Sequence, residues 1–102
     1  MPDVLKTVCR IELVHPDDGG RTTPLYPSYR PNHNFFDAVV GPMAMGEVVP
    51  IGCEYVMPGE TFDAEIEFTS SEELIEMIHV GLRWKVQEGH RVVGHGEVLE
   101  IL

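Results

Sequence analysis

Two cysteines, five histidines and the pair Asp17-Asp18 are the residues of this chain that could bind a metal or act as nucleophile or base. Outside that pair they are Cys9, Cys53, His15, His33, His79, His90 and His95. Metal sites use ligands at short fixed spacings such as C-x-x-C or H-E-x-x-H, and the chain has neither motif. His90 and His95 lie five residues apart in a predicted strand, so they point to opposite faces unless a bulge intervenes. A small metal- or thiol-dependent enzyme is therefore only an alternative, and we expect no catalytic residue, no metal and no cofactor.

The charge balance restricts the class of partner. Seven lysines and arginines stand against 17 aspartates and glutamates, which gives a formal net charge of −10. Such a charge repels nucleic acids and anionic membranes at long range. We therefore expect a protein partner with a basic patch, and no membrane partner. The 102 residues suit one domain, residues 1–102, with one modest core.

No segment approaches the roughly 20 consecutive apolar residues that a membrane-spanning helix needs. The first ten residues, MPDVLKTVCR, lack the apolar region of a secretory signal. With only two cysteines and no export signal, reduced and buried thiols are expected rather than a disulfide. These features together predict a cytoplasmic protein.

Alternation of apolar and polar side chains predicts strands at residues 9–13, 61–68 and 82–87. The turn Glu88-Gly89-His90 then leads into a strand at residues 91–99, which makes this segment a hairpin. Gly94 and Gly96 in that last strand predict a bulge or a place where another backbone comes close.

The middle of the chain has shorter elements. Residues 35–40 and 47–51 are predicted strands, separated by a turn at Gly41-Pro42, and residues 57–59 (Met-Pro-Gly) suit a type II turn. One short helix is predicted at residues 70–77, with a capping box from Ser70 to Glu73. The apolar run at residues 38–45 is either turn and core or an adaptable contact surface. Many short strands without a long helix predict an all-β barrel or sandwich, with a core that includes Phe35, Phe36, Phe62, Phe68 and Trp84.

The loop at residues 19–31, GGRTTPLYPSYRP, is unusually stiff, polar and aromatic. It contains three prolines, two arginines, two tyrosines and a glycine pair. Glycines allow backbone angles that other residues avoid, and prolines stiffen a long connection. The loop either caps one end of the fold or contacts a partner directly.

Three blocks of this chain resemble the C-terminal barrel, the third domain, of elongation factor Tu. They are GGRTTPLYPSYRP at residues 19–31, VMPGE at residues 56–60 and GLRWKVQEGHRVVGHGEVLEIL at residues 81–102. Members of that family carry a Gly-Gly-Arg-x-Thr-Pro loop ending in Tyr-Arg-Pro, a Val-Met-Pro-Gly turn and a similar final hairpin, in the same order. The resemblance covers the chain from about Val8 to Leu102, and it implies a six-stranded antiparallel Greek-key β-barrel.

The family's binding residues can be placed on the matching positions. In full-length factors this barrel helps to hold the T-stem backbone of aminoacyl-tRNA, packs on the GTPase domain and meets the nucleotide-exchange factor. The resemblance implies tRNA-facing positions at Arg21, Thr22 and Thr23. The binding surface that we predict, for protein or tRNA, consists of Gly20, Arg21, Thr22, Thr23, Tyr29, Arg30, Arg83, Gly89, His90 and Arg91.

The chain also departs from the family pattern. It has no GxxxxGK[ST] phosphate loop, so we expect no nucleotide hydrolysis, and the second barrel is absent. Thr22 stands where the family has histidine, and Gly89-His90 replaces Gly-Gly in the last hairpin. Residues 37–55 contain no family motif, and residues 70–80 are altered and more acidic.

These features favour a stand-alone, non-catalytic, translation-related module that binds a protein, as a partner or as a decoy for a toxin that targets the factor. Phosphate binding of useful affinity needs about six contacts. The loop and hairpin supply only five cations, so an elongation-factor fragment that retains aminoacyl-tRNA binding is the alternative. A remnant or excised piece of a longer factor is a third interpretation. Barrel closure leaves few free strand edges, which favours a monomer.

Overall fold

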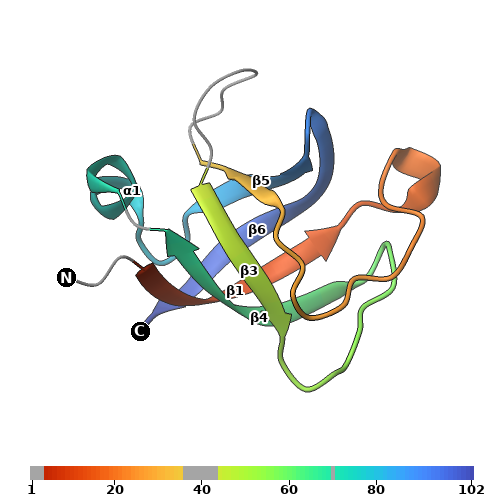
Figure 1. Ribbon diagram of the computed structural model, residues 1–102, viewed down its shortest axis with the longest axis horizontal. Coiled ribbons are helices and arrows are strands. Elements are labelled where there is room, and N and C mark those ends of the chain that lie inside the picture. Colours follow the sequence, from red (N-terminus) through yellow and green to blue (C-terminus); the bar gives the residue numbers. More distant parts are fainter. Residues whose placement is uncertain (1–3, 36–43, 70) are drawn as a thin grey trace.

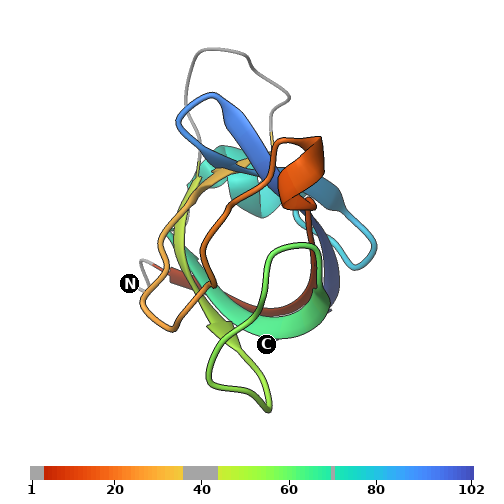
Figure 2. The same ribbon diagram turned by 90° about the vertical axis from the view of Figure 1, so that its right-hand side faces the viewer.

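Six antiparallel strands close into a barrel, which confirms the predicted fold. The computed structural model of the protein describes residues 4–35, 44–69 and 71–102. The strands follow one another around the barrel in the order β1-β4-β3-β2-β5-β6, and β6 pairs with β1 to complete the circle (Figures 1 and 2). They are β1 (Val4–Leu13), β2 (Asn32–Asn34), β3 (Ala44–Pro50), β4 (Thr61–Thr69), β5 (Arg83–Glu88) and β6 (Arg91–Ile101).

Strand β1 joins the two halves of the barrel, because it pairs with β4 on one side and with β6 on the other. Its alternating sequence turns Cys9, Ile11 and Leu13 inward, where each is buried. Arg10 and Glu12 point to solvent, as the period of two predicts.

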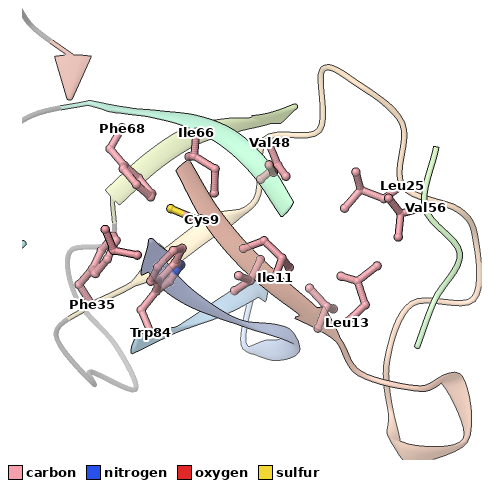
Figure 3. Packing of buried hydrophobic residues seen from close by; sticks show 14 of the residues in the cluster. Cys9, Ile11, Leu13, Leu25, Phe35, Val48, Val56, Ile66, Phe68 and Trp84 are labelled. Atoms are coloured by element: carbon pink, nitrogen blue, oxygen red, sulfur yellow. The ribbon is translucent and has the colours of Figure 1, made fainter. Parts of the chain in front are cut away.

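The core has an aromatic end and an aliphatic end (Figure 3). Phe35, Phe68 and Trp84 gather at the first, and all three are buried, as expected from the sequence. Phe62 is half-buried and packs against the core, while Phe36 lies outside the described residues. At the other end, Leu25 and Val56 from two loops meet Leu13 of β1 (Figure 3). Barrel ends must be filled in this way because six strands enclose an interior only as wide as the side chains in it.

A buried histidine lies at the centre of the aromatic end. The indole N–H of Trp84 donates a hydrogen bond to His33 Nδ1 (3.1 Å), so His33 must carry its proton on Nε2, which donates to the carbonyl of Gly46 (3.0 Å). The imidazole ring also packs edge-to-face on the ring of Phe68, with 4.8 Å between the two ring centroids. Burial lowers the pKa of His33 to about 4, and the hydrogen bond to Gly46 offsets only part of that effect. His33 is therefore a neutral core residue.

The final hairpin contains both features that its glycines predicted. A register shift opposite Val86 and Gln87 leaves Val93 as an extra residue, which forms a bulge beside Gly94. A side chain at Gly94 would lie 3.0 Å from the carbonyl oxygen of Glu12 on β1, which is the predicted close approach of another backbone. At Gly96 the close group is instead a side chain, because the indole ring of Trp84, directly opposite, occupies the space where a side chain at residue 96 would be.

Other predicted elements differ in position. Strand β2 ends at Asn34, before the predicted strand at residues 35–40, of which residues 36–40 lie outside the described residues. The predicted strand at residues 47–51 corresponds to β3, which begins at Ala44 and ends at Pro50. The turn at residues 57–59 is confirmed, with Gly59 at φ 88° and the Glu60 N–H bonded to the Met57 carbonyl at 3.2 Å.

The α-helix α1 (Glu72–Met77) covers the barrel end opposite the aliphatic loops, and its Leu74 is buried (Figure 1). The predicted capping box from Ser70 is wrong by one residue, because Ser71 is the N-cap and its hydroxyl accepts from the Leu74 N–H at 3.1 Å. Ser70 itself lies outside the described residues. Among the helices of the described chain, none is long and apolar enough to cross a membrane.

The prediction that both cysteines are buried is wrong for Cys53. Cys9 is a free, buried thiol in β1, but Cys53 is free and exposed in the loop after β3. That loop has no alternating pattern of apolar and polar residues, so its sequence did not indicate whether Cys53 is buried or exposed.

The close packing of Trp84 on Gly96 predicts that one methyl group added at residue 96 strongly destabilises the folded protein. A methyl group at residue 96 would lie 2.4 Å from Cζ2 of Trp84, far inside van der Waals contact. Gly96→Ala should lower the free energy of unfolding by about 3 kcal/mol, as overpacked cores do. The matched control is His95→Ala on the outer face, expected to change it by less than about 0.5 kcal/mol in urea denaturation. Equal stabilities of the two variants would contradict this account of the hairpin.

The neutral state of His33 predicts a pH-dependent stability. The unfolded chain takes up a proton at this residue below about pH 6.5, whereas the folded chain does so only near pH 4. The free energy of unfolding should therefore fall as the pH is lowered from about 6.5 to 4, with about 3 kcal/mol lost through His33. In NMR spectra, the ring resonances of His33 should stay constant from pH 8 to about 5.5 in the folded protein. In the urea-unfolded chain they should titrate near pH 6.5, and titration there in the folded state would disprove the assignment.

Candidate binding site

The loop that follows β1 begins with a single turn of helix and a glycine pair. The 3-10 helix η1 (Pro16–Asp18) is capped by His15, whose Nδ1 accepts from the Asp17 N–H at 3.1 Å. Gly19 ends the turn in the left-handed region at φ 93°, where glycine is favoured. A side chain at Gly20 would lie 1.9 Å from the carbonyl oxygen of Val14. Each glycine of the pair therefore has a separate steric reason to be glycine.

The rest of the loop crosses the aliphatic end of the barrel and is attached to it at two points. Leu25 forms an isolated antiparallel bridge with Val56, and both side chains are buried. Tyr29 forms a second bridge with Val48 of β3. The loop is therefore a fixed plug of the barrel, seen across the near end in Figure 2.

Arg21 connects this plug to the final hairpin. Its guanidinium donates to Glu88 at the end of β5, and Nη2 also donates to the Thr23 hydroxyl and the Pro24 carbonyl, both at 3.1 Å. Nε donates to the Thr23 carbonyl at 3.3 Å. The guanidinium lies over the ring of Tyr29, 4.6 Å from its centroid, in a cation–π contact. With four hydrogen bonds inside the chain and a side chain only 16% exposed, Arg21 is an internal residue of the fold.

Glu88 receives two hydrogen bonds on one oxygen. Arg21 and the Tyr29 hydroxyl both donate to its Oε2. Partial burial alone would raise the pKa of Glu88, but the bonds from Tyr29 and Arg21 outweigh it, and the net effect lowers that pKa. Burial, followed by the bond to this carboxylate, raises the pKa of Tyr29. At neutral pH the cluster therefore holds an anionic Glu88, a cationic Arg21 and a neutral Tyr29.

Around this cluster lie six more of the ten predicted site residues. Arg91 faces Glu88 across the hairpin and also lowers the pKa of that carboxyl by its charge. Gly89 forms the hairpin turn at φ 62°. The loop and the turn thus form one surface, the loop–hairpin face, whose exposed members are Thr22, Thr23, Gly89, His90 and Arg91. Arg21 and Tyr29 lie half-buried beneath them, and Gly20 is buried.

Arg30 and Arg83 lie elsewhere. Arg30 follows the plug and reaches Glu47 of β3 at 3.5 Å. Arg83 begins β5, five residues before Glu88, which places it roughly 17 Å along the strand from the cluster. It approaches Glu97 of β6 at 4.0 Å. The predicted site is therefore not one patch, because these two arginines belong to other parts of the outer surface.

The residues considered for metal or thiol chemistry do not come together. Within residues 4–35, 44–69 and 71–102, no three side chains of His, Cys, Asp or Glu are placed to hold a metal ion. Burial raises the pKa of Cys9 to about 11, and a hydrogen bond with Thr7 reduces that effect only in part. A thiol with this pKa is protonated at neutral pH and is a poor nucleophile.

Glu88 is the site residue that the sequence motifs did not identify. The sequence places it in a turn beside Arg91, but its principal partner, Arg21, is 67 residues away. The only local signal is an acidic residue at a hairpin end that follows a long Arg-containing loop, and such a signal is common on exposed turns.

The role of Glu88 as anchor of the loop can be tested by removing its charge. Glu88→Gln leaves the nearly buried Arg21 without its anion, so the free energy of unfolding should fall by about 1–2 kcal/mol. The matched control is Glu97→Gln, whose pair with Arg83 is longer and largely exposed, and we expect a loss below about 0.5 kcal/mol. Urea denaturation measures both, and equal losses would show that the cluster is an ordinary surface ion pair.

The chain was also compared with known protein families. No family model matches it. The resemblance to the third domain of elongation factor Tu therefore stays a prediction that rests on the three sequence blocks described above.

Proposed function

We propose that this protein is a non-catalytic binding module of the type found at the C-terminal end of elongation factor Tu, and that it binds a protein of the translation machinery or one that targets it. The closed six-stranded barrel agrees with the fold that the resemblance implies. The first and third sequence blocks, although separated by 49 residues (32–80), meet in the loop–hairpin face. The second block supplies Val56, whose bridge to Leu25 seats the loop.

The observation that carries the proposal is the contact of Arg21 with Glu88 and Tyr29. It fixes the loop against the hairpin before any partner arrives, so binding need not order a mobile segment. Thr22, Thr23 and His90 then present hydroxyl and imidazole groups on a rigid frame. In this proposal Arg21 shapes the face, and the exposed residues beside it make the contact.

Electrostatics favour a protein partner over RNA. Five cations of the described residues each approach a carboxylate of the same chain: Lys6, Arg10, Arg21, Arg30 and Arg83. A phosphate would have to compete with these carboxylates for each cation, against a net charge of −10. The resemblance places Arg21 toward tRNA, yet its guanidinium already makes four hydrogen bonds within the chain.

Two features support a non-catalytic role. The sequence lacks a phosphate-binding loop, so the nucleotide chemistry of the full-length factor has no counterpart here. The thiol of Cys9 is shielded inside the barrel with a pKa of about 11. We therefore propose that the protein acts by occupying a partner's surface.

The proposal predicts that the exposed residues of the loop–hairpin face determine binding. The intact protein and the single variants Thr22→Asp and His90→Asp would be used as baits in lysate, with captured proteins quantified by mass spectrometry. We expect a translation-associated protein or a toxin with the intact bait, reduced at least about ten-fold by either variant because an unpaired carboxylate would be buried at the contact. His95→Asp, a histidine on the outer face of β6, is the matched control and should leave capture unchanged.

Retention of tRNA at low salt is measured on the same baits. Capture of tRNA that Thr22→Asp abolishes would overturn protein binding in favour of the RNA role of the full-length factor. Capture that His95→Asp reduces as strongly as the other two variants would show that the loop–hairpin face is not the site.

A further inference from the structure

A ladder of cross-strand charges runs along the outer face of β1 and β4. Lys6 lies opposite Glu67 and Arg10 lies opposite Asp63, with ion pairs of 3.5 and 3.0 Å. Because alternate residues of a strand share a face, the position between these two rungs belongs to the same face. That middle rung pairs Val8 with Glu65.

Glu65 is the carboxylate of this ladder without a cation. Its cross-strand neighbours are Val8 on β1 and Val49 on β3, and both are apolar. Glu65 makes no ion pair or side-chain hydrogen bond with any described residue. Its carboxylate therefore lies on a rung between two valines and has no ion-pair partner among the described residues.

The next rung adds to the excess of negative charge. Glu47 of β3 lies directly opposite Glu67, an arrangement of like charges that is unfavourable across a sheet. Arg30 approaches Glu47 and Lys6 approaches Glu67, each at 3.5 Å, so these two carboxylates are balanced from outside the rung. Glu65 is then the carboxylate of these rungs that no ion pair of the described residues balances.

Glu65 lines a hollow together with apolar side chains and the ion pairs Lys6–Glu67 and Arg30–Glu47. The hollow has a volume of about 380 Å³ and lies over β1, β3 and β4. Val4, Met45 and Val49 line it and are 42%, 46% and 37% exposed. Scattered apolar residues are usual on protein surfaces. Here three of them line one hollow together with a carboxylate that has no ion-pair partner, so the hollow offers a partner both apolar contacts and a negative charge.

We propose that this hollow, named the Glu65 hollow, binds a partner protein through an arginine or lysine flanked by apolar side chains. The cation would pair with Glu65 and supply the missing charge of the ladder. Its methylene stem would lie on Val8 and Val49, and the neighbouring apolar side chains would cover Met45 and Val4. This inference rests on the proposed protein-binding function and deepens it by naming a second contact surface and the chemistry of the partner.

The charge of the whole chain agrees with this occupant. A net charge of −10 attracts a basic protein surface and speeds its encounter, and an uncompensated carboxylate at the contact favours cations over anions. Nucleic acid and anionic lipid carry the wrong charge for Glu65. In a second copy of this chain, Lys6, Arg10, Arg21, Arg30 and Arg83 already approach carboxylates of their own chain.

The test uses defined peptides and NMR titration of the intact protein. The first peptide alternates leucine with arginine, the second replaces every arginine by glutamate, and the third replaces every leucine by serine. We expect saturable shifts of Val8, Met45, Val49 and Glu65 with the first peptide at moderate salt. The second peptide should give none, and the third should bind at least about five-fold more weakly.

Two variants separate binding from folding. Val8→Lys places a cation opposite Glu65 within the chain, so it should keep or raise the melting temperature while weakening the first peptide at least about ten-fold. Glu65→Gln removes the charge and should weaken that peptide to a similar extent. Glu54→Gln, in the exposed loop after β3, is the control and should change neither property.

The inference is overturned if the first peptide gives no saturable shifts, if the shifts lie away from the hollow, or if the glutamate peptide binds equally well. It is also overturned if Val8→Lys binds as the unaltered protein does. The failure of this inference and that of the proposed function are distinguishable. Loss of lysate capture in Thr22→Asp reports on the loop–hairpin face, whereas the peptide titration reports only on the Glu65 hollow.

Discussion

The closure of the sheet on itself through β1 is the constraint on which the rest of this structure depends. Because β1 is hydrogen-bonded along both edges, the sheet closes into a barrel. The interior of a barrel with so few strands is only as wide as the side chains that fill it. Where two large groups would collide, one is absent, as when Gly96 makes room for Trp84. Where the barrel ends, something apolar must enter, and Leu25, Val56 and Leu74 do so from loops and from the helix.

This constraint explains why the most conspicuous loop is so firmly held. A segment that inserts Leu25 into the barrel cannot move freely, and its polar residues must find partners near the place where it crosses. Arg21 finds them in the loop itself and in the final hairpin. The two interpretations of the loop, as a cap or as a contact surface, are therefore compatible, because the cap is what makes the exposed residues rigid.

The strands with a period of two could be predicted from the sequence, because a strand with one buried face alternates apolar and polar residues. Residues 61–68 are an example, with Ala64, Ile66 and Phe68 buried and the intervening acids in water. Strand β2 has only three residues, of which His33 and Asn34 are both buried, so it shows no alternation of apolar and polar residues. The exposure of Cys53 and the cap at Ser71 depend on loop paths that local composition does not specify.

The site was predictable only in part for a related reason. Thr22, Thr23 and His90 could be named from motifs, but the link from Arg21 to Glu88 spans 67 residues and arises from the barrel's topology. The Glu65 hollow depends on register, since Val8, Glu65 and Val49 become neighbours only when three strands are aligned. A single sequence contains the residues of such a rung but does not state which of them face one another.

Trp84 is the single tryptophan of the chain, and its surroundings make it a natural spectroscopic probe. Its indole is buried, bonded to His33, stacked on Phe35 at 4.9 Å and pressed against Gly96. It therefore touches three parts of the barrel wall at once: β2 with the residue that follows it, β6, and β4 through the ring of Phe68. Its intrinsic fluorescence reports, without any label, whether the barrel is closed.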